Sequence, residues 1–289
     1  MDQQHMNIQW YPGHMTKTRR QIEADLKQVD AVCEIVDARI PQSSRNPDID
    51  TICAGKPRII ILNRMDLADA AATKKWLAYF KDLGMASIAT DCKTKKGISE
   101  FQPAVRSVLK EKIARNEAKG MNRPLRVMIV GIPNVGKSTL INQISGRKGA
   151  KAENRPGVTR GKQWVTVDSS LLLLDTPGIL WPKFDDPNVG MMLAYTGAVK
   201  ENIIDTEELA CRLAVLLWKY YPQTLRNRYG IDVPQDMPGY QLIEEMGRKR
   251  GYLLSRGEIN TERMSKVLLD EYRSGKLGHF TLEMPEDLS

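Results

Sequence analysis

The middle of the chain carries a glycine-rich loop of the form G-x-x-x-x-G-K-[ST], at Gly131–Ser138. It follows the apolar run Leu125–Val130 and precedes Thr139–Ile141, an order that predicts strand, loop and helix. The backbone N–H groups of such a loop, with the positive end of the helix behind it, form a cradle for phosphate groups. We therefore expect an α/β fold with a nucleotide site. A glycine-rich turn without a ligand is the alternative, which the strand-to-helix context disfavours.

Two side chains of this loop have predicted roles in chemistry. Lys137 is predicted to be catalytic, because its ammonium would reach the β- and γ-phosphates, and the Ser138 hydroxyl would hold Mg²⁺. The residues of this region that we expect to bind the nucleotide are Asn134, Val135, Gly136, Lys137, Ser138 and Thr139.

A second motif, Asp-Thr-Pro-Gly from Asp175 to Gly178, directly follows the apolar run Leu171–Leu174 and begins 37 residues after the phosphate loop ends. Asp175 is a predicted metal ligand, because an aspartate at a strand end can hold a water bound to Mg²⁺. The Gly178 N–H can meet the terminal phosphate. Between the two motifs, Thr159 is the candidate for a threonine that completes the Mg²⁺ coordination. A turn capped by an aspartate is the alternative interpretation of Asp175.

A base-recognition motif lies far upstream, where Asn-Arg-Met-Asp ends the β-branched run Arg58–Leu62. Guanine is usually selected by N-K-x-D, whose aspartate accepts hydrogen bonds from the guanine N1–H and 2-amino groups, a pair that adenine cannot supply. The four residues are Asn63, Arg64, Met65 and Asp66. Arginine replaces the usual lysine, and its aliphatic stem could still stack over the base.

Two further residues, Asp91 and Cys92, follow the next predicted strand and complete the predicted base pocket. The Cys92 backbone N–H could meet the guanine oxygen. The base-recognition motif therefore precedes the phosphate and Mg²⁺ motifs, which is a circular permutation of the ordinary GTPase order. Such a permutation needs no new fold, since a sheet can be rewired where its old termini were adjacent.

Composition and charge constrain the class and the partners of the protein. The 289 residues are 42% hydrophobic and 27% charged, as in ordinary globular proteins. No run approaches the roughly 20 apolar residues that span a bilayer, and the polar start does not resemble a secretion signal. The four cysteines lack C-x-x-C spacing, so we expect reduced thiols in a cytoplasmic protein that does not bind a membrane.

The charge is uneven along the chain. Residues 206–289 hold 12 Lys/Arg and 13 Asp/Glu, so the net +8 of the chain arises in residues 1–205. A basic excess favours a polyanion such as RNA, although a solvated surface with spare lysines is an equal alternative.

The apolar patterns predict two domains. Residues 1–205 are expected to hold an N-terminal segment and a doubly wound, mainly parallel sheet, and residues 206–289 a small all-helical domain. The predicted strands are 31–36, 58–62, 85–89, 125–130, 164–167 and 171–174, and the predicted helices are 16–26, 70–83, 101–117, 139–145, 207–220, 237–246 and 261–273.

The motif order and several longer stretches resemble the circularly permuted GTPases, and within them the ribosome biogenesis GTPase A family. The stretches that carry the resemblance are Trp10–Met15, Asp37–Pro47, Gly131–Ile141, Pro156–Thr159, Asp175–Phe184 and Glu244–Gly251. The resemblance covers essentially the whole chain. It implies binding of GTP and GDP with Mg²⁺, GTP hydrolysis coupled to a late step of large ribosomal subunit assembly, and contact of the helical domain with rRNA.

The same resemblance suggests how water is positioned for hydrolysis. Ile179 stands where many GTPases have a glutamine that orients the attacking water, and it has no polar group for that task. The family is described as supplying a histidine from its N-terminal segment, which His14 matches, so His14 is a predicted catalytic residue. The family pattern also associates Asn134 with a K⁺ ion that assists hydrolysis.

The basic cluster Arg248–Arg250 is a candidate rRNA contact, together with Lys17, Arg19 and Arg20. A solvated helix end is the alternative for the cluster.

Three functions remain open at this point. The first is a GTPase that binds a precursor of the large ribosomal subunit, hydrolyses GTP there and leaves, and that is a monomer when free. The second is a nucleotide-gated RNA-binding scaffold with little hydrolysis of its own. The third, a small-molecule kinase, is disfavoured because it needs neither the Asn63–Asp66 motif nor the motif at Asp175.

Overall fold

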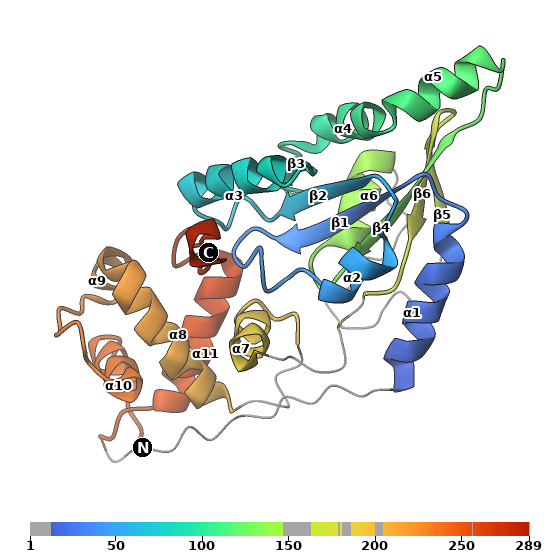
Figure 1. Ribbon diagram of the computed structural model, residues 1–289. Coiled ribbons are helices and arrows are strands. Elements are labelled where there is room, and N and C mark those ends of the chain that lie inside the picture. Colours follow the sequence, from blue (N-terminus) through green and yellow to red (C-terminus); the bar gives the residue numbers. More distant parts are fainter. Residues whose placement is uncertain are drawn as a thin grey trace.

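The computed structural model describes residues 13–146, 163–178, 180, 186–199, 205–255 and 257–288, with side chains from residue 20 onward. A six-stranded sheet forms its centre, in the order β3-β2-β1-β4-β6-β5 (Figure 1). All neighbouring strands are parallel except β5 and β6, which are antiparallel. The strands are β1 (Ala31–Asp37), β2 (Arg58–Asn63), β3 (Ala86–Thr90), β4 (Leu125–Gly131), β5 (Gln163–Asp168) and β6 (Leu171–Asp175). The predicted doubly wound sheet is therefore confirmed.

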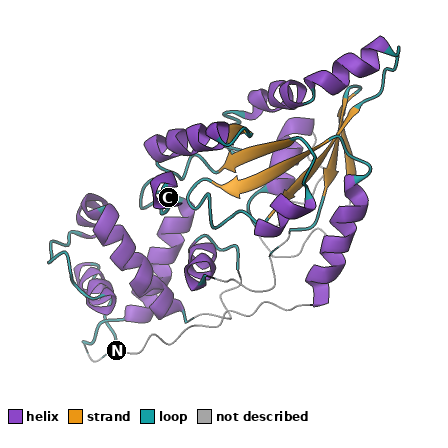
Figure 2. Ribbon diagram, in the orientation of Figure 1, coloured by secondary structure: helices purple, strands orange, loops and turns teal. Residues whose placement is uncertain are grey.

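Helices cover both faces of the sheet (Figure 2), because the side chains of each strand alternate between them. In β1, Cys33 and Ile35 belong to one apolar cluster with α4 and α6, whereas Val32 packs with α1 and α2 and Val36 with α3. The helices of this part of the chain are α1 (Gly13–Leu26), α2 (Pro47–Ile52), α3 (Ala70–Asp82), α4 (Phe101–Val108), α5 (Lys110–Ala118) and α6 (Lys137–Ser145).

The second half of the chain is helical after the sheet ends, as predicted. Its helices are α7 (Pro187–Tyr195), α8 (Thr206–Tyr220), α9 (Pro222–Tyr229), α10 (Gly239–Lys249) and α11 (Thr261–Ser274). The helix α8 contributes six buried residues to this region, and its apolar stripe packs against α10 and α11. In Figure 1, α7 lies between the sheet and the group formed by α8 to α11.

The prediction of one helix over 101–117 is wrong. The backbone leaves helical geometry at Leu109 (φ −103°, ψ 12°), which ends α4 and precedes α5. Leu109 is buried in the core, whereas α5 beyond it has no buried residue. The bend thus separates a helix that covers the sheet from one that leaves it.

The C-terminal segment returns to the sheet domain after α11. Its main chain donates from Leu282 to the Arg39 carbonyl at 2.8 Å, and the Trp76 indole donates to the Glu283 carbonyl at 2.9 Å. The Glu283 carboxylate accepts from the backbone N–H of Gln42 at 2.8 Å and from that of Ser43. The domain boundary predicted at residue 205 stays a prediction, and these contacts tie the last residues of the second unit to the first.

Candidate nucleotide site

The predicted phosphate loop lies at the point where the chain order of the sheet reverses. From β1 the strand numbers rise outward through β2 and β3 on one side, and through β4 and β6 on the other. Ligands of open α/β sheets bind at such a switch point, outside the carboxyl ends of the strands. The loop Gly131–Ser138 follows β4 there, and the motif that follows β2 ends at the same edge.

Asn63 joins the base-recognition motif to the phosphate loop. Its amide nitrogen donates to the Val135 carbonyl at 2.8 Å. Its amide oxygen accepts from the Thr90 hydroxyl at 3.0 Å and from the Cys92 thiol at 3.3 Å. A side chain at Gly136 (φ 102°) would place its Cβ 2.4 Å from the Asn63 amide nitrogen, so the fit requires glycine. Two motifs more than 70 residues apart are thereby held together.

Arg64 contacts the phosphate loop. It adopts a left-handed backbone conformation (φ 61°), and its guanidinium donates to the Asn134 carbonyl at 2.5 Å. The same group lies 3.7 Å from the Asp37 carboxylate at the end of β1, which Arg39 also contacts with two hydrogen bonds. The guanidinium therefore contacts the phosphate loop and a buried ion pair, which lysine, with a single ammonium, could not do in the same way. Stacking of its stem on a base stays a prediction.

The remaining base-site residues have distinct environments. The Asp66 carboxylate is 23% exposed and lies 3.5 Å from the Lys93 ammonium, so it is accessible to a ligand. The Asp91 carboxylate instead accepts from the Lys93 N–H at 2.7 Å and the Thr94 hydroxyl at 2.5 Å, and thus stabilises its own loop. Although burial opposes it, this hydrogen bonding lowers the pKa of Asp91.

The other two predicted residues of the base pocket, Cys92 and Met65, form hydrogen bonds with residues at the ends of β2 and β3. Burial raises the pKa of Cys92 to about 12, so its thiol stays protonated and donates to Asn63. The Met65 N–H donates to the Thr90 carbonyl at 3.1 Å.

Lys137 is a buried cation in the phosphate loop. Its side chain is 7% exposed, and the ammonium donates to the carbonyls of Gly131 at 3.1 Å and Ile132 at 2.8 Å. Burial lowers the pKa of Lys137 to about 8, and the nearby Asp175 carboxylate opposes this shift. The environment therefore favours an added anion, such as a phosphate, next to the ammonium.

Asp175 and Ser138 lie together, as a Mg²⁺ site requires. The Ser138 hydroxyl is 3.5 Å from one Asp175 oxygen. The other carboxylate oxygen, Oδ1, is buried and has no hydrogen-bond partner in the described parts of the chain. Burial raises the pKa of Asp175, because the charged form lacks solvation. A buried carboxylate oxygen without a donor fits a hydrated divalent cation.

Gly178 approaches the phosphate loop closely. A Cβ on Gly178 would lie 2.8 Å from the Cα of Pro133 and 3.1 Å from the Lys137 ammonium. Only glycine lets the backbone come this near. The Asp175–Gly178 motif thus faces the predicted position of the terminal phosphate. Val135, within the loop, is buried, and Thr139 lies in the first turn of α6.

Two predicted residues cannot be placed. Thr159 lies outside the described residues, and of His14, the second residue of α1, only the backbone is described. Their roles stay predictions.

The sequence comparisons agree with this geometry. A protein-family model described as "50S ribosome-binding GTPase" matches residues 126–226. Ribosome biogenesis GTPase A of Priestia megaterium is 46% identical over 285 residues, which cover 98% of each chain. This chain belongs to the ribosome biogenesis GTPase A family. The Thermotoga maritima member is 32% identical over 98% of this chain and 96% of its own. Mitochondrial ribosome-associated GTPase 1 of Xenopus tropicalis is 34% identical over 78% of this chain and 75% of its own.

Solved structures of a relative share the fold. A GDP-bound structure of TM YlqF has a TM-score of 0.66 and 28% identity, and covers 93% of this chain and 100% of that one. GNP-bound YlqF from T. maritima has a TM-score of 0.64, also at 28% identity, and covers 93% of this chain and 99% of that one.

The family resemblance expected from the sequence is thus confirmed. The chain has a circularly permuted GTPase fold, binds guanine nucleotide, hydrolyses GTP and takes part in ribosome biogenesis with ribosome-related partners. No helix in the described ranges is long and apolar enough to cross a membrane.

The buried Lys137 of this GTPase should make GTP affinity dependent on pH. A phosphate prefers the charged ammonium, so GTP should bind the protonated form and raise the pKa of Lys137. Since the free protein loses this proton near pH 8, the association constant should fall up to about tenfold per pH unit above that value. Titrations of GTP between pH 7 and pH 9.5 would measure the slope. Lys137→Met is the control, because titration of the guanine itself affects both proteins equally; equal slopes would contradict the prediction.

Proposed function

We propose that this GTPase binds the maturing large ribosomal subunit, and that GTP hydrolysis is coupled to a late assembly step and to its own release. The observation that supports the site most strongly is the Asn63–Val135 hydrogen bond, which holds base-recognition and phosphate motifs at one sheet edge. A binding surface for both ends of one guanine nucleotide follows from it. The names of the relatives and the basic excess in residues 1–205 support a ribosomal RNA partner.

The proposed binding roles divide between the two motifs. Asp66 would accept from the guanine edge, and Asn63 with Cys92 would shape the pocket around it. Lys137 would neutralise phosphate charge, with the Gly178 N–H facing the γ-phosphate. Mg²⁺ would be held by Ser138, Asp175 and Thr159, and when bound it supplies positive charge to the phosphate oxygens.

Hydrolysis requires a group that orients water, since Ile179 cannot. We propose His14 for this role, and replacing it with alanine should keep GTP affinity while lowering turnover about tenfold or more, because positioning is lost. Turnover of the two proteins at saturating GTP and Mg²⁺ would measure the effect. His279, which lies near the chain end, is the matched control, and His279→Ala should leave turnover unchanged. Unchanged turnover in His14→Ala would refute the assignment.

Asn134 is the proposed contact for K⁺. Its amide nitrogen donates to the Gly197 carbonyl at 3.0 Å, so its amide oxygen is the atom that a cation would contact.

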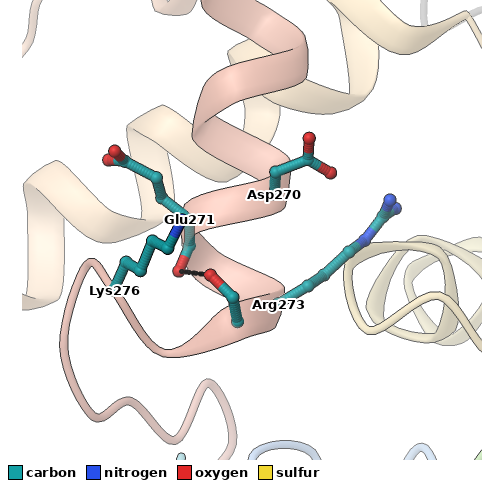
Figure 3. A pocket seen from close by; sticks show the side chains of 5 residues that line it. Asp270, Glu271, Arg273 and Lys276 are labelled. Carbon is teal, nitrogen blue, oxygen red and sulfur yellow. Dashed lines mark hydrogen bonds between the residues drawn. The ribbon is translucent and has the colours of Figure 1, made fainter.

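The same Asn134 contact supports communication between the nucleotide and the helical region. Gly197 follows α7, and α7 follows the Asp175–Gly178 motif in the chain. At the end of α7, the Ala194 and Tyr195 carbonyls accept from the Arg273 guanidinium at 2.8 Å and 3.0 Å. Figure 3 shows Arg273 extending from α11 on the side opposite to Glu271 and Lys276. A change at the phosphate loop could therefore shift α7 against α11.

Two side chains of the candidate rRNA contact Arg248–Arg250 have local partners. The Arg248 guanidinium contacts Glu245 at 2.7 Å, and that of Arg250 lies 5.2 Å from the centre of the Tyr229 ring. Lys249 is exposed between them. We propose that this cluster supplies one part of a larger RNA-binding surface.

Sedimentation with large-subunit precursor particles tests the proposed cycle. The protein should associate with particles about tenfold more tightly with a non-hydrolysable GTP analogue than with GDP, because only the triphosphate offers a terminal phosphate to the Asp175–Gly178 motif. Equal association in both nucleotide states would contradict the proposed coupling of GTP hydrolysis to release. Particles should also raise GTP turnover, whereas a nucleotide-gated scaffold would bind without that increase. We place the protein in the cytoplasm. We also propose that it is a monomer when it is free, and sedimentation without particles would check that oligomeric state.

A further inference from the structure

A basic pocket lies at the opposite edge of the sheet from the nucleotide site. It has a volume of about 510 Å³ and is lined by residues that precede three parallel strands and by one face of α5. Asp30 precedes β1, Pro57 precedes β2 and Arg123 lies shortly before β4. The phosphate loop follows the carboxyl end of β4, so the length of a strand, roughly 20 Å, separates the two sites.

The lining of the pocket is positively charged. Four of its residues are basic and two, Asp30 and Glu111, are acidic. The basic ones are Lys56, Lys112, Arg115 and Arg123. The surrounding segment 110–126, which includes the basic linker into β4, holds six Lys/Arg and two Asp/Glu. The excess of charge is therefore local and continues beyond the pocket.

Asp30 holds two of the four basic side chains in place, and its single negative charge does not neutralise all four. Its carboxylate is 2.5 Å from the Lys112 ammonium and 3.0 Å from the Arg123 guanidinium, and it accepts from the Arg126 N–H at 2.8 Å. Burial opposes ionisation, yet these contacts lower the pKa of Asp30, so it stays charged. The Lys112 and Arg123 side chains remain 38% and 49% exposed.

Arg115 adds a cation without an ion-pair partner among the described residues. It is exposed and makes no ion pair with any residue that the structure describes. It lies on α5, a nine-residue helix with no buried residue. Figure 1 shows α5 projecting from the body of the molecule beyond α4. A helix this short gains most of its stability from packing, so a partner that covers it would stabilise it.

We propose that this pocket and α5 bind the phosphodiester backbone of RNA. The inference rests on the proposed function, since that function supplies an RNA partner, and it names a contact surface on the GTPase domain itself. Guanidinium groups bind phosphate with two parallel hydrogen bonds. A protein partner is less suited, because protein interfaces are usually centred on aromatic anchors and none of the described residues lining this pocket is aromatic.

The position of the pocket has a functional consequence. RNA bound there would leave the nucleotide edge of the sheet uncovered, so the protein could stay anchored while GTP is hydrolysed. This contact would then contribute affinity in both nucleotide states, and the state-dependent part would come from other surfaces.

The test compares two double variants with equal loss of charge. Arg115→Gln/Arg123→Gln removes two cations of the pocket and keeps a hydrogen-bond donor near Asp30. Lys74→Gln/Lys81→Gln removes two exposed cations from α3. Affinity for protein-free large-subunit rRNA is measured over a range of salt concentrations. The pocket variant should bind about tenfold more weakly, with a salt slope smaller by about 2, while the α3 variant follows the wild type.

GTP affinity and intrinsic turnover should stay unchanged in both variants, which also shows that they fold. If the pocket variant binds rRNA as tightly as the α3 variant, this inference fails and the proposed function stands. If the wild type binds neither rRNA nor precursor particles, the proposed partner fails, and this surface fails with it.

A photo-crosslinking residue at Asn116, which also lines the pocket, gives a direct readout on precursor particles. Crosslinks to RNA would support the proposal, and crosslinks only to protein would overturn it.

Discussion

Replacing Asp66 with asparagine should shift the preference of this GTPase from GTP to xanthosine triphosphate. The substitution would remove the carboxylate that accepts two hydrogen bonds from guanine. An asparagine amide can instead donate to the carbonyl that xanthine carries in place of the 2-amino group. Hydrogen bonds to charged groups contribute about 1.5–3 kcal/mol each, so GTP affinity should fall by roughly 10²–10⁴. Dissociation constants of GTP, xanthosine triphosphate and ATP for both proteins would measure the exchange.

Asp69→Asn is the matched control for this substitution. Asp69 begins α3, where its carboxylate accepts from the N–H groups of Ala71 at 2.7 Å and Ala72 at 2.9 Å. Asparagine caps a helix equally well, so the control changes the same charge at nearly the same place without affecting the fold. It should leave the nucleotide preference as it is. A preference for GTP in Asp66→Asn as strong as in the control would show that another group reads the base.

The sheet and its site were predictable because their signals are local. Most strands are short apolar runs bounded by turn residues, and the motifs that begin at Asn63, Gly131 and Asp175 directly follow such runs. Parallel strands end at one edge, so listing the residues after β2, β4 and β6 already lists most of the candidate site. The circular permutation did not affect this prediction, because it changes the order of the strands in the chain and leaves the residues that follow each strand at the same edge of the sheet.

Three helices were missed for one physical reason. The helices α2, α7 and α9 all begin with proline in the first turn. No helix was predicted there, although proline is well suited to the first helical position, where the missing N–H has no partner in any case. Asn46 and Asp186 precede two of them and cap them by side-chain hydrogen bonds. An asparagine or aspartate before proline was the signal available in the sequence.

Long-range side-chain contacts could not be predicted from spacing. The position of Arg64 on the phosphate loop depends on its left-handed backbone, and the Arg273 contact with α7 depends on how two distant helices pack. Neither has a local sequence pattern. Both concern how the site is held and connected, whereas its chemical groups were identified from the motifs.

Replacing Lys137 with methionine should nearly abolish GTP hydrolysis while relieving an electrostatic penalty in the nucleotide-free protein. Loss of one preorganised cation at a phosphoryl group lowers turnover by about 10³ or more. A variant that retained turnover within about tenfold of the wild type would exclude the catalytic role. GTP affinity should fall as well, since methionine fills the space without charge.

Stability measurements would show that this effect arises from a buried cation. In the wild type the folded pKa of Lys137 is lowered to about 8, so the unfolded state binds more protons between pH 8 and the ordinary lysine value of 10.5. Wild-type stability should therefore rise with pH across that window, relative to Lys137→Met, by up to about 1.4 kcal/mol per unit. Chemical unfolding of both proteins without nucleotide measures the difference. A difference that does not vary with pH would place the ammonium in solvent, and the expected pH dependence of GTP affinity would be lost with it.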